Sequence, residues 1–315
     1  MANIHPTLTS LFEDIADAIR NSSPITEKIK ADVFPAYIRM LDYTGDIPET
    51  PSILDSCSWD FIRWASDEGI ADLIWSVGDR KSVSIGAFGN TGSQYQVNPG
   101  TCYCYILGFD HNSSLEGTNK IHFEFGFNAV SGGIHIAFTG GDYSLSYKSD
   151  TSIVYFPRMN RTNTNSGGWK SSTMRTGTLN GTTRSFASAA PNDLKNVIKP
   201  TTKYTDNVGN GSGSVASNVS STVDSFFILN VVEVYGTTHY INRYEANYTK
   251  QYQYYKNGNS MVHYRSDKTT EAAYTWTRSP IRDNATDFVC KGGAEGYYGF
   301  IDAYTCRGIA PAFCV

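Results

Sequence analysis

The sequence has little charge, no long apolar run and no secretory start. Only 18% of its 315 residues are charged and the net charge is -4, so it lacks the basic stripe that a nucleic-acid groove requires. No run of 18 apolar residues is present, so we expect no membrane insertion. Residues 1–10 have neither the basic start nor the apolar core of a signal peptide, which predicts synthesis in the cytoplasm without one.

The cysteines also lack a pattern that would indicate a metal site. The spacing of Cys102 and Cys104 places their side chains on opposite faces of a strand, whereas zinc sites normally use pairs separated by two residues. We therefore expect free buried thiols and no metal. The six are Cys57, Cys102, Cys104, Cys290, Cys306 and Cys314.

Catalytic motifs are missing as well. The chain contains no GxSxG, no phosphate-binding GxxxxGK[ST] and no HExxH. The nearest approach to a carboxylate–histidine pair is Asp110-His111, which is better explained as a turn that closes a strand. We expect neither catalysis nor a cofactor.

What the chain does contain is tyrosine, of which there are 21, together with many serine, threonine, asparagine and glycine residues. This composition is typical of recognition loops, because tyrosine offers a large contact area at low entropic cost. A β-rich protein with many turns would have a similar composition, and both interpretations stay open.

The pattern predicts a helical segment (1–45), a linker (46–56) and one large domain (57–315). Helices are expected at 9–20 and 33–41 from apolar residues at helical spacing, with Pro35 near the start of the second. Two such short helices cannot bury both apolar faces alone, so this segment either docks on a partner, self-associates or caps the main domain.

Within the large domain, the pattern predicts several further elements. Helices are expected at 58–73, 191–198 and 240–255, and strands at 81–85, 101–109, 120–127 and 226–235. Alternation in 120–127 predicts a half-buried strand with His122 on its solvent face or elsewhere in the sheet. Residues 158–181 and 205–222 are expected to be loops, and the tyrosines of 240–255 to fill the core.

The last forty residues are the most informative. They begin with Trp276-Thr277-Arg278-Ser279-Pro280 and end with Gly308-Ile309-Ala310-Pro311-Ala312-Phe313-Cys314-Val315. Between these two frame segments lies a run of small, polar and aromatic residues with no helical or strand period. Such an arrangement indicates a binding surface that loops display from a scaffold.

Four motifs, in order, resemble one uncharacterised domain that is widespread in gut Firmicutes and their prophages. They are Trp75-Ser76-Val77-Gly78-Asp79, Ile106-Leu107-Gly108-Phe109-Asp110-His111, Gly167-Gly168-Trp169-Lys170 and the segment 276–280. The closing segment 308–313 resembles the last strand of C-type-lectin-fold variable proteins that retroelements diversify, a fold similar to that of the formylglycine-generating enzymes. Ile15-Ala16-Asp17-Ala18-Ile19-Arg20 followed by Phe34-Pro35 resembles leaders of phage tail and baseplate proteins.

The resemblance implies an α+β, C-type-lectin-like domain in a phage or prophage receptor-binding protein. Its ligand would be a bacterial surface protein or glycan, and 1–45 would attach it to a tail or baseplate protein or form a homo-oligomer, with a trimer as the closest analogy. It would then act at a virion tail tip or on a cell surface. An oxidase like the formylglycine-generating enzymes and a structural tail or baseplate subunit are the alternatives. The calcium-lectin signatures Glu-Pro-Asn, Gln-Pro-Asp and Trp-Asn-Asp are absent.

The same resemblance places a variable region at 276–315. Diversification of AAY codons yields every residue except Trp, Met, Lys, Glu and Gln, and between 278 and 315 only Lys291 and Glu295 belong to those five types. Chance composition would give the same result. The residues expected to contact the ligand are Ile281, Arg282, Asp283, Asn284, Thr286, Asp287, Tyr297, Tyr298, Phe300, Asp302, Tyr304, Thr305 and Arg307.

Overall fold

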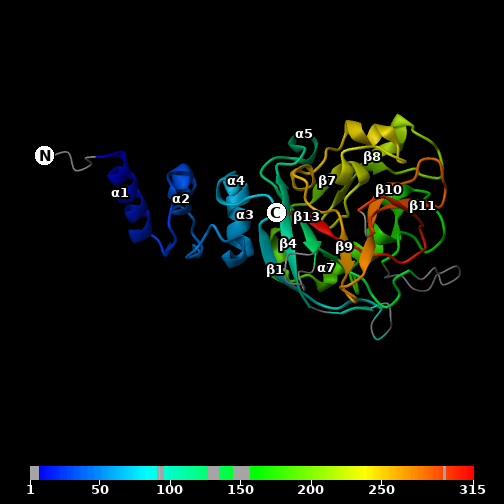
Figure 1. Cartoon of the computed structure of the whole chain (residues 1–315), viewed down its shortest axis with the longest axis horizontal. Helices are drawn as coiled ribbons and strands as arrows, with labels where there is room; N and C mark the ends of the chain where they lie inside the picture. Colours follow the sequence, from blue (N-terminus) through cyan, green and yellow to red (C-terminus); the bar gives the residue numbers. More distant parts are fainter. Residues whose placement is uncertain are drawn as a thin grey trace.

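The computed structural model describes residues 7–90, 92, 96–98, 100–126, 135–144, 157–293 and 296–315. Helices and mainly antiparallel sheets follow one another along the chain, so the expected α+β class is confirmed. Figure 1 shows an elongated molecule, with α1 and α2 at one end and the sheets in a rounded body at the other. In this described part of the chain, no helix is long and apolar enough to cross a membrane.

The two N-terminal helices form where the apolar spacing predicts them. The Thr7 hydroxyl accepts a hydrogen bond from the Ser10 backbone N–H at 3.1 Å, and the Ser10 hydroxyl oxygen accepts one from the Thr7 backbone N–H. These two bonds cap the first helix. Pro35 lies in the first turn of the second helix, where its missing N–H costs no bond. Phe12 and Phe34 join the two, with ring centroids 5.8 Å apart. The elements are α1 (Leu8–Asn21), η1 (Ala31–Val33) and α2 (Phe34–Met40).

The expected linker, 46–56, is packed against the body rather than extended. It contains a short 3-10 turn, η2 (Leu54–Ser56), and the Trp75 indole N–H donates a hydrogen bond to the Pro51 carbonyl at 2.9 Å. One hydrophobic cluster runs from Ala16 in α1 to Val315 at the end of the chain. The N-terminal helices therefore share a continuous core with the rest of the molecule.

The helix expected at 58–73 is divided in two. Ser58 caps its start as predicted, accepting a hydrogen bond from Phe61 N at 3.1 Å. Gly69 has a φ of +66°, a left-handed conformation that ends the helix. The expectation of one continuous helix was therefore wrong, and the two helices are α3 (Trp59–Asp67) and α4 (Ala71–Ile74).

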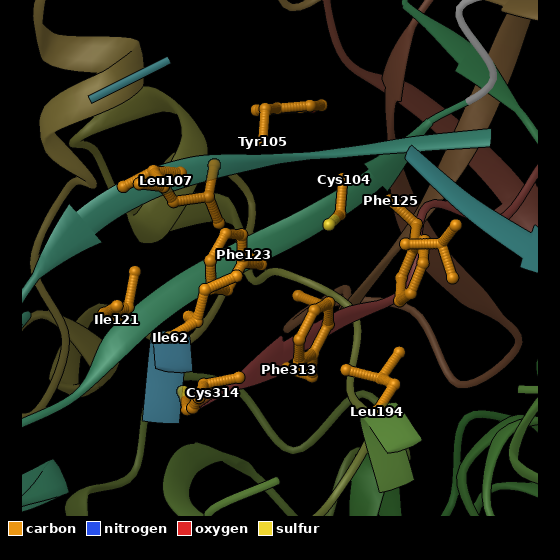
Figure 2. Close-up of a cluster of buried hydrophobic side chains, with 14 of the residues drawn as sticks. Ile62, Cys104, Tyr105, Leu107, Ile121, Phe123, Phe125, Leu194, Phe313 and Cys314 are labelled. Carbon is orange, nitrogen blue, oxygen red and sulfur yellow. The ribbon is translucent and has the colours of Figure 1, made fainter. Parts of the chain in front are cut away.

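The first sheet is antiparallel and has the strand order β1-β4-β5-β13. Phe313 pairs with Phe123 in register, and their rings stack with centroids 5.1 Å apart. Figure 2 shows Phe123, Phe125 and Phe313 gathered on one side of this sheet, with Tyr105 on the other. The strands of this sheet are β1 (Arg80–Ile85), β4 (Gly100–Phe109), β5 (Ile121–Gly126) and β13 (Ala312–Cys314). The first three confirm the strands predicted at 81–85, 101–109 and 120–127.

Both faces of β5 are covered, so the expected solvent face does not exist. The apolar side chains meet α3, where the rings of Phe123 and Trp59 lie 5.8 Å apart. His122 and Glu124 point to the other face and are fully buried. Polar partners make this burial tolerable, because the Tyr105 hydroxyl donates a hydrogen bond to Glu124 at 2.5 Å. His122 is thus a buried sheet residue.

The second sheet has five strands in the order β12-β11-β10-β9-β6, so β12 is an edge strand. All of its pairs are antiparallel except that between β6 and β9. Its strands are β6 (Ile136–Ala137), β9 (His263–Arg265), β10 (Ala272–Pro280), β11 (Asp287–Gly292) and β12 (Gly299–Asp302). The remaining strands form two hairpins, β2 (Phe88–Gly89) with β3 (Gln96–Val97) and β7 (Thr201–Asp206) with β8 (Val219–Asp224).

Three expectations for residues 205–255 were wrong. Residues 205–222 are not one loop, because their two ends pair as β7 and β8. The expected strand at 226–235 does not form: Phe227 makes only an isolated bridge to Ala312, and a capping box between Asn230 and Glu233 then starts a helix, α9 (Val231–Tyr235). The tyrosine stripe of 240–255 is not one helix but two short ones, η5 (Arg243–Asn247) and α10 (Gln253–Lys256).

The segment 158–181, expected to be a loop, contains a short helix and a π-helical turn. Gly168 has a φ of +51°, and a Cβ atom there would lie 2.0 Å from the Asp206 carbonyl oxygen, so only glycine fits. The predicted helix at 191–198 is confirmed, with Pro191 at its start. The remaining short helices are α5 (Ser113–Glu116), α6 (Gly168–Ser171), η3 (Met174–Leu179), α7 (Phe186–Ala189), α8 (Asn192–Val197) and η4 (Ala216–Asn218).

Candidate ligand-binding surface

The two frame segments of the C-terminal region are buried and bonded to each other. Trp276 is 1% exposed, and its backbone N–H donates to the Gly308 carbonyl at 2.9 Å. Gly308 in turn donates to the Tyr274 carbonyl at 2.9 Å. The Trp276 indole N–H donates to Pro157 at 2.7 Å. The residues between the frames are therefore held at both ends by fixed backbone.

A buried ion network fixes the first frame segment to the centre of the molecule. The Arg278 guanidinium donates two hydrogen bonds to the Glu233 carboxylate, at 2.6 and 2.8 Å. Lys203 contacts Glu233 at 3.2 Å and Glu116 at 2.6 Å. All four side chains are fully or almost fully buried, so each charge depends on its partners to offset the cost of leaving water. The pKa of Glu233, which burial alone would raise, is held below its usual range by Arg278 and Lys203.

The same cluster contains the nearest approach to a metal site in the described part of the chain. Ligand atoms of His111, Glu116 and Glu233 lie within 4.8 Å of one another. The Lys203 ammonium already lies between the two carboxylates and supplies the positive charge that a cation would bring. Burial raises the pKa of Glu116 to about 7, which weakens it further as a ligand at neutral pH. The cluster is better explained as a structural network.

The first group of predicted contact residues lies on the turn between β10 and β11. Asn165 holds this turn from inside, because its side-chain amide donates to the carbonyls of Asn284 and Asp287 at 2.6 and 2.8 Å. Asp283 is exposed on it. Ile281 is only 8% exposed and packs inward. Half-buried side chains complete the group: Arg282, Asn284, Thr286 and Asp287.

The second group lies on and just before the edge strand β12. Tyr297 is 67% exposed and Phe300 is 44% exposed. Tyr298 is half-buried, and its hydroxyl lies 3.2 Å from that of Thr237. Asp302 is also half-buried and accepts a hydrogen bond from the Asn163 amide at 2.8 Å. This group presents more exposed aromatic area than any other part of the predicted site.

The last three predicted residues point largely inward. Tyr304 is 8% exposed and Thr305 is 4% exposed. Arg307 is half-buried, with its guanidinium carbon 5.5 Å from the centre of the Tyr143 ring. Tyr304 and Thr305, like Ile281, offer almost no surface to a ligand. We therefore remove these three residues from the predicted contact set.

A loop that the sequence analysis did not select completes the surface. Tyr240 is 47% exposed, and its ring lies 4.5 Å from that of Phe300 and 6.2 Å from that of Tyr298. His239 is exposed and parallel to the Tyr298 ring at 6.0 Å. We call His239, Tyr240, Tyr297, Tyr298 and Phe300 the aromatic surface.

Tyr240 is held in a backbone conformation that tyrosine rarely adopts. Its φ is +63°, in the left-handed region, which costs a non-glycine residue on the order of 1–3 kcal/mol. Its carbonyl accepts a hydrogen bond from Arg282 N at 3.0 Å, so the two loops fix each other. Strain of this kind persists where the surroundings enforce it, and here it displays a large ring toward solvent.

Comparison with known proteins identifies the family of this chain. The profile described as Domain of unknown function (DUF6273) matches residues 149–315, more than half of the chain, so the chain belongs to this family. The matched region contains the aromatic surface and both frame segments. Comparisons with curated proteins and with solved structures give no match.

Proposed function

We propose that this member of the DUF6273 family is a receptor-binding protein of a phage or prophage, and that the aromatic surface binds a protein or glycan on a bacterial cell. One observation carries the proposal: two loops distant in sequence bring exposed rings together beside the predicted turn 281–287. Exposed tyrosines clustered on a rigid support are the residues that commonly anchor interfaces. Charged side chains at the edge, such as Arg282 and Asp283, would add specificity.

We further propose that the body has a C-type-lectin-like fold. The short last strand β13 lies in the first sheet beside β5, and the two frame segments lie next to each other through Trp276 and Gly308. The exposed residues then form a loop surface on a closed scaffold, as the resemblance implies. Retroelement diversification would confine variation among close relatives to the exposed positions of 281–302.

An oxidase like the formylglycine-generating enzymes is less well supported. All six cysteines are buried and unpaired. Burial raises the pKa of the Cys290 and Cys306 thiols, so neither has the thiolate character that copper binding or redox chemistry uses.

Removing single rings should test the binding function. We expect Tyr240→Ala, Tyr297→Ala and Phe300→Ala each to weaken binding of labelled protein to host cells at least about fivefold, as loss of an interface anchor does. The control is Tyr204→Ala. Tyr204 is a half-buried tyrosine of β7, outside the sheet that contains β12, and its ring stacks on that of Tyr248. If all four variants bind as the wild type does, the aromatic surface is not the contact, and a structural subunit becomes the better explanation.

The N-terminal helices should support self-association. Leu8 is 65% exposed and Phe12 is 36% exposed on α1, while Ile38 is 51% exposed on α2. We propose that these apolar side chains join copies of the chain, with a trimer as the expected state. Light scattering should then show a trimer for the wild type and a monomer for Leu8→Glu/Phe12→Glu. Val223→Glu, at an equally exposed valine on β8, should leave the mass unchanged.

A further inference from the structure

A hollow beside α9 is lined by none of the residues of the aromatic surface. Val232 of α9 lines the hollow, and Tyr235, three residues further along the same helix, packs against Tyr298 with ring centroids 4.3 Å apart. The volume of the hollow is about 580 Å³, within the range of small-molecule sites. Its walls come from the end of β4, from α9 and from residues 246–256.

The charge of the hollow has one sign. Lys250 and Lys256 line it and are exposed, and no carboxylate does so among the described residues. Neither lysine forms an ion pair within the described part of the chain. Apolar area is provided mainly by the half-buried Phe109, because Val232 is only 4% exposed. The lining therefore combines two available ammonium groups with a hydrophobic wall.

His111 lies in the lining on a strained turn. The residues on either side of it, Asp110 and Asn112, have φ values of 47° and 49°, a conformation uncommon outside glycine. Asn112 is held by a hydrogen bond to the Tyr248 carbonyl at 2.7 Å, and His111 stacks on Tyr252 with ring centroids 3.8 Å apart. His111 is 8% exposed, and its Nε2 atom has no hydrogen-bond partner. The fold thus maintains a costly turn to place an imidazole in this wall.

The buried charges behind His111 do not cancel the positive charge of the lysines. Glu233 is neutralised by Arg278 and Lys203, and Glu116 by Lys203. These two carboxylates face two cations, so no unpaired negative charge lies beneath the hollow. An anion entering it would meet a net positive field from Lys250 and Lys256.

We propose that this hollow binds a small organic anion, such as a sugar that carries a carboxylate or phosphate group. The anionic group would pair with Lys250 and Lys256, and the carbon skeleton would pack on Phe109. Ammonium groups suit either anion as point charges. The site shares no residue with the aromatic surface.

The test is isothermal titration of the full chain with glucose 6-phosphate and with galacturonate, with neutral glucose as the reference ligand. We expect saturable binding of at least one anion at 150 mM salt, and at least tenfold weaker binding by Lys250→Gln/Lys256→Gln. The matched control is Lys28→Gln/Lys30→Gln, which makes the same change in net charge at exposed lysines near α2 and should bind as the wild type does.

Two titration results would overturn the proposal. One is the absence of saturable binding of either anion by the wild type. The other is an equal loss of binding in both double variants, which would show a general effect of net charge rather than a site. Binding in the hollow should also shift the His111 imidazole resonances in the wild type, and shifts confined to other residues would place the anion elsewhere.

Discussion

Arg278→Met should lower the free energy of unfolding by about 3–5 kcal/mol, the loss expected when one partner of a buried ion pair is removed. The change leaves Glu233 in the core without the two hydrogen bonds that it accepts from Arg278. It also removes donors to the Ile228 carbonyl at 2.7 Å and to Thr205 Oγ1 at 2.8 Å. Urea denaturation at pH 7 measures the loss, and near-ultraviolet circular dichroism reports whether the core stays ordered.

The matched control is Arg282→Met, four positions along the chain. Arg282 pairs with Asp283 at 2.8 Å, but their side chains are 39% and 68% exposed, so removing this pair should cost no more than about 1 kcal/mol. Arg278→Met/Glu233→Gln should lose less than the sum of its two single changes, because the uncompensated charge is gone. A loss below 1 kcal/mol for Arg278→Met would contradict the role assigned to this pair.

The sequence predicted those elements whose pattern is local. α1 shows apolar residues at helical spacing and β4 is a long apolar run, so both were found within one or two residues. The tyrosines of 240–255 led to the wrong prediction of one helix, because they recur at helical spacing but are buried by contacts with distant parts of the chain. The Tyr252 hydroxyl accepts a hydrogen bond from Lys203 at 2.8 Å, and that of Tyr255 contacts Glu124. Such partners, 49 and 131 residues away, leave no local signal.

The candidate site was found only in part for the same reason. The resemblance to variable proteins and the two frame segments selected 281–307, which includes the exposed Tyr297 and Phe300. They could not separate these from the buried Tyr304, because exposure depends on how β12 pairs with β11. Tyr240 was missed because it reaches the site only through the contact of its loop with Arg282.

The buried histidines should make the protein sensitive to acid, and His263 isolates the effect. It is fully buried, its Nδ1 lies 3.3 Å from the Met261 carbonyl, and its Nε2 has no hydrogen-bond partner. Burial, together with the nearby charges of Lys291 and His135, holds the pKa of His263 well below its usual value of 6.5. The unfolded chain therefore binds a proton below pH 6.5 that the folded chain excludes. Stability must fall as pH decreases from 6.5 toward the folded pKa, by about 1.4 kcal/mol per pH unit.

His263→Asn should remove this contribution while keeping a donor to Met261. Between pH 6.5 and 4.5 the variant should lose up to about 2.3 kcal/mol less stability than the wild type, whatever constant difference the substitution itself introduces. Burial raises the pKa of Glu245 to about 8 and that of Asp142 to about 6, and these carboxyls act in the opposite direction over the same range. Both are present in the two proteins, so their effect cancels in the comparison.

Urea denaturation at half-unit pH steps measures the two slopes. His239→Asn, which removes an exposed imidazole from the aromatic surface, is the matched control for loss of a histidine. If His263→Asn and the wild type lose stability in parallel from pH 6.5 to 4.5, then His263 takes up a proton in the folded state as readily as in the unfolded one. Its burial beside Lys291 would then not govern its titration.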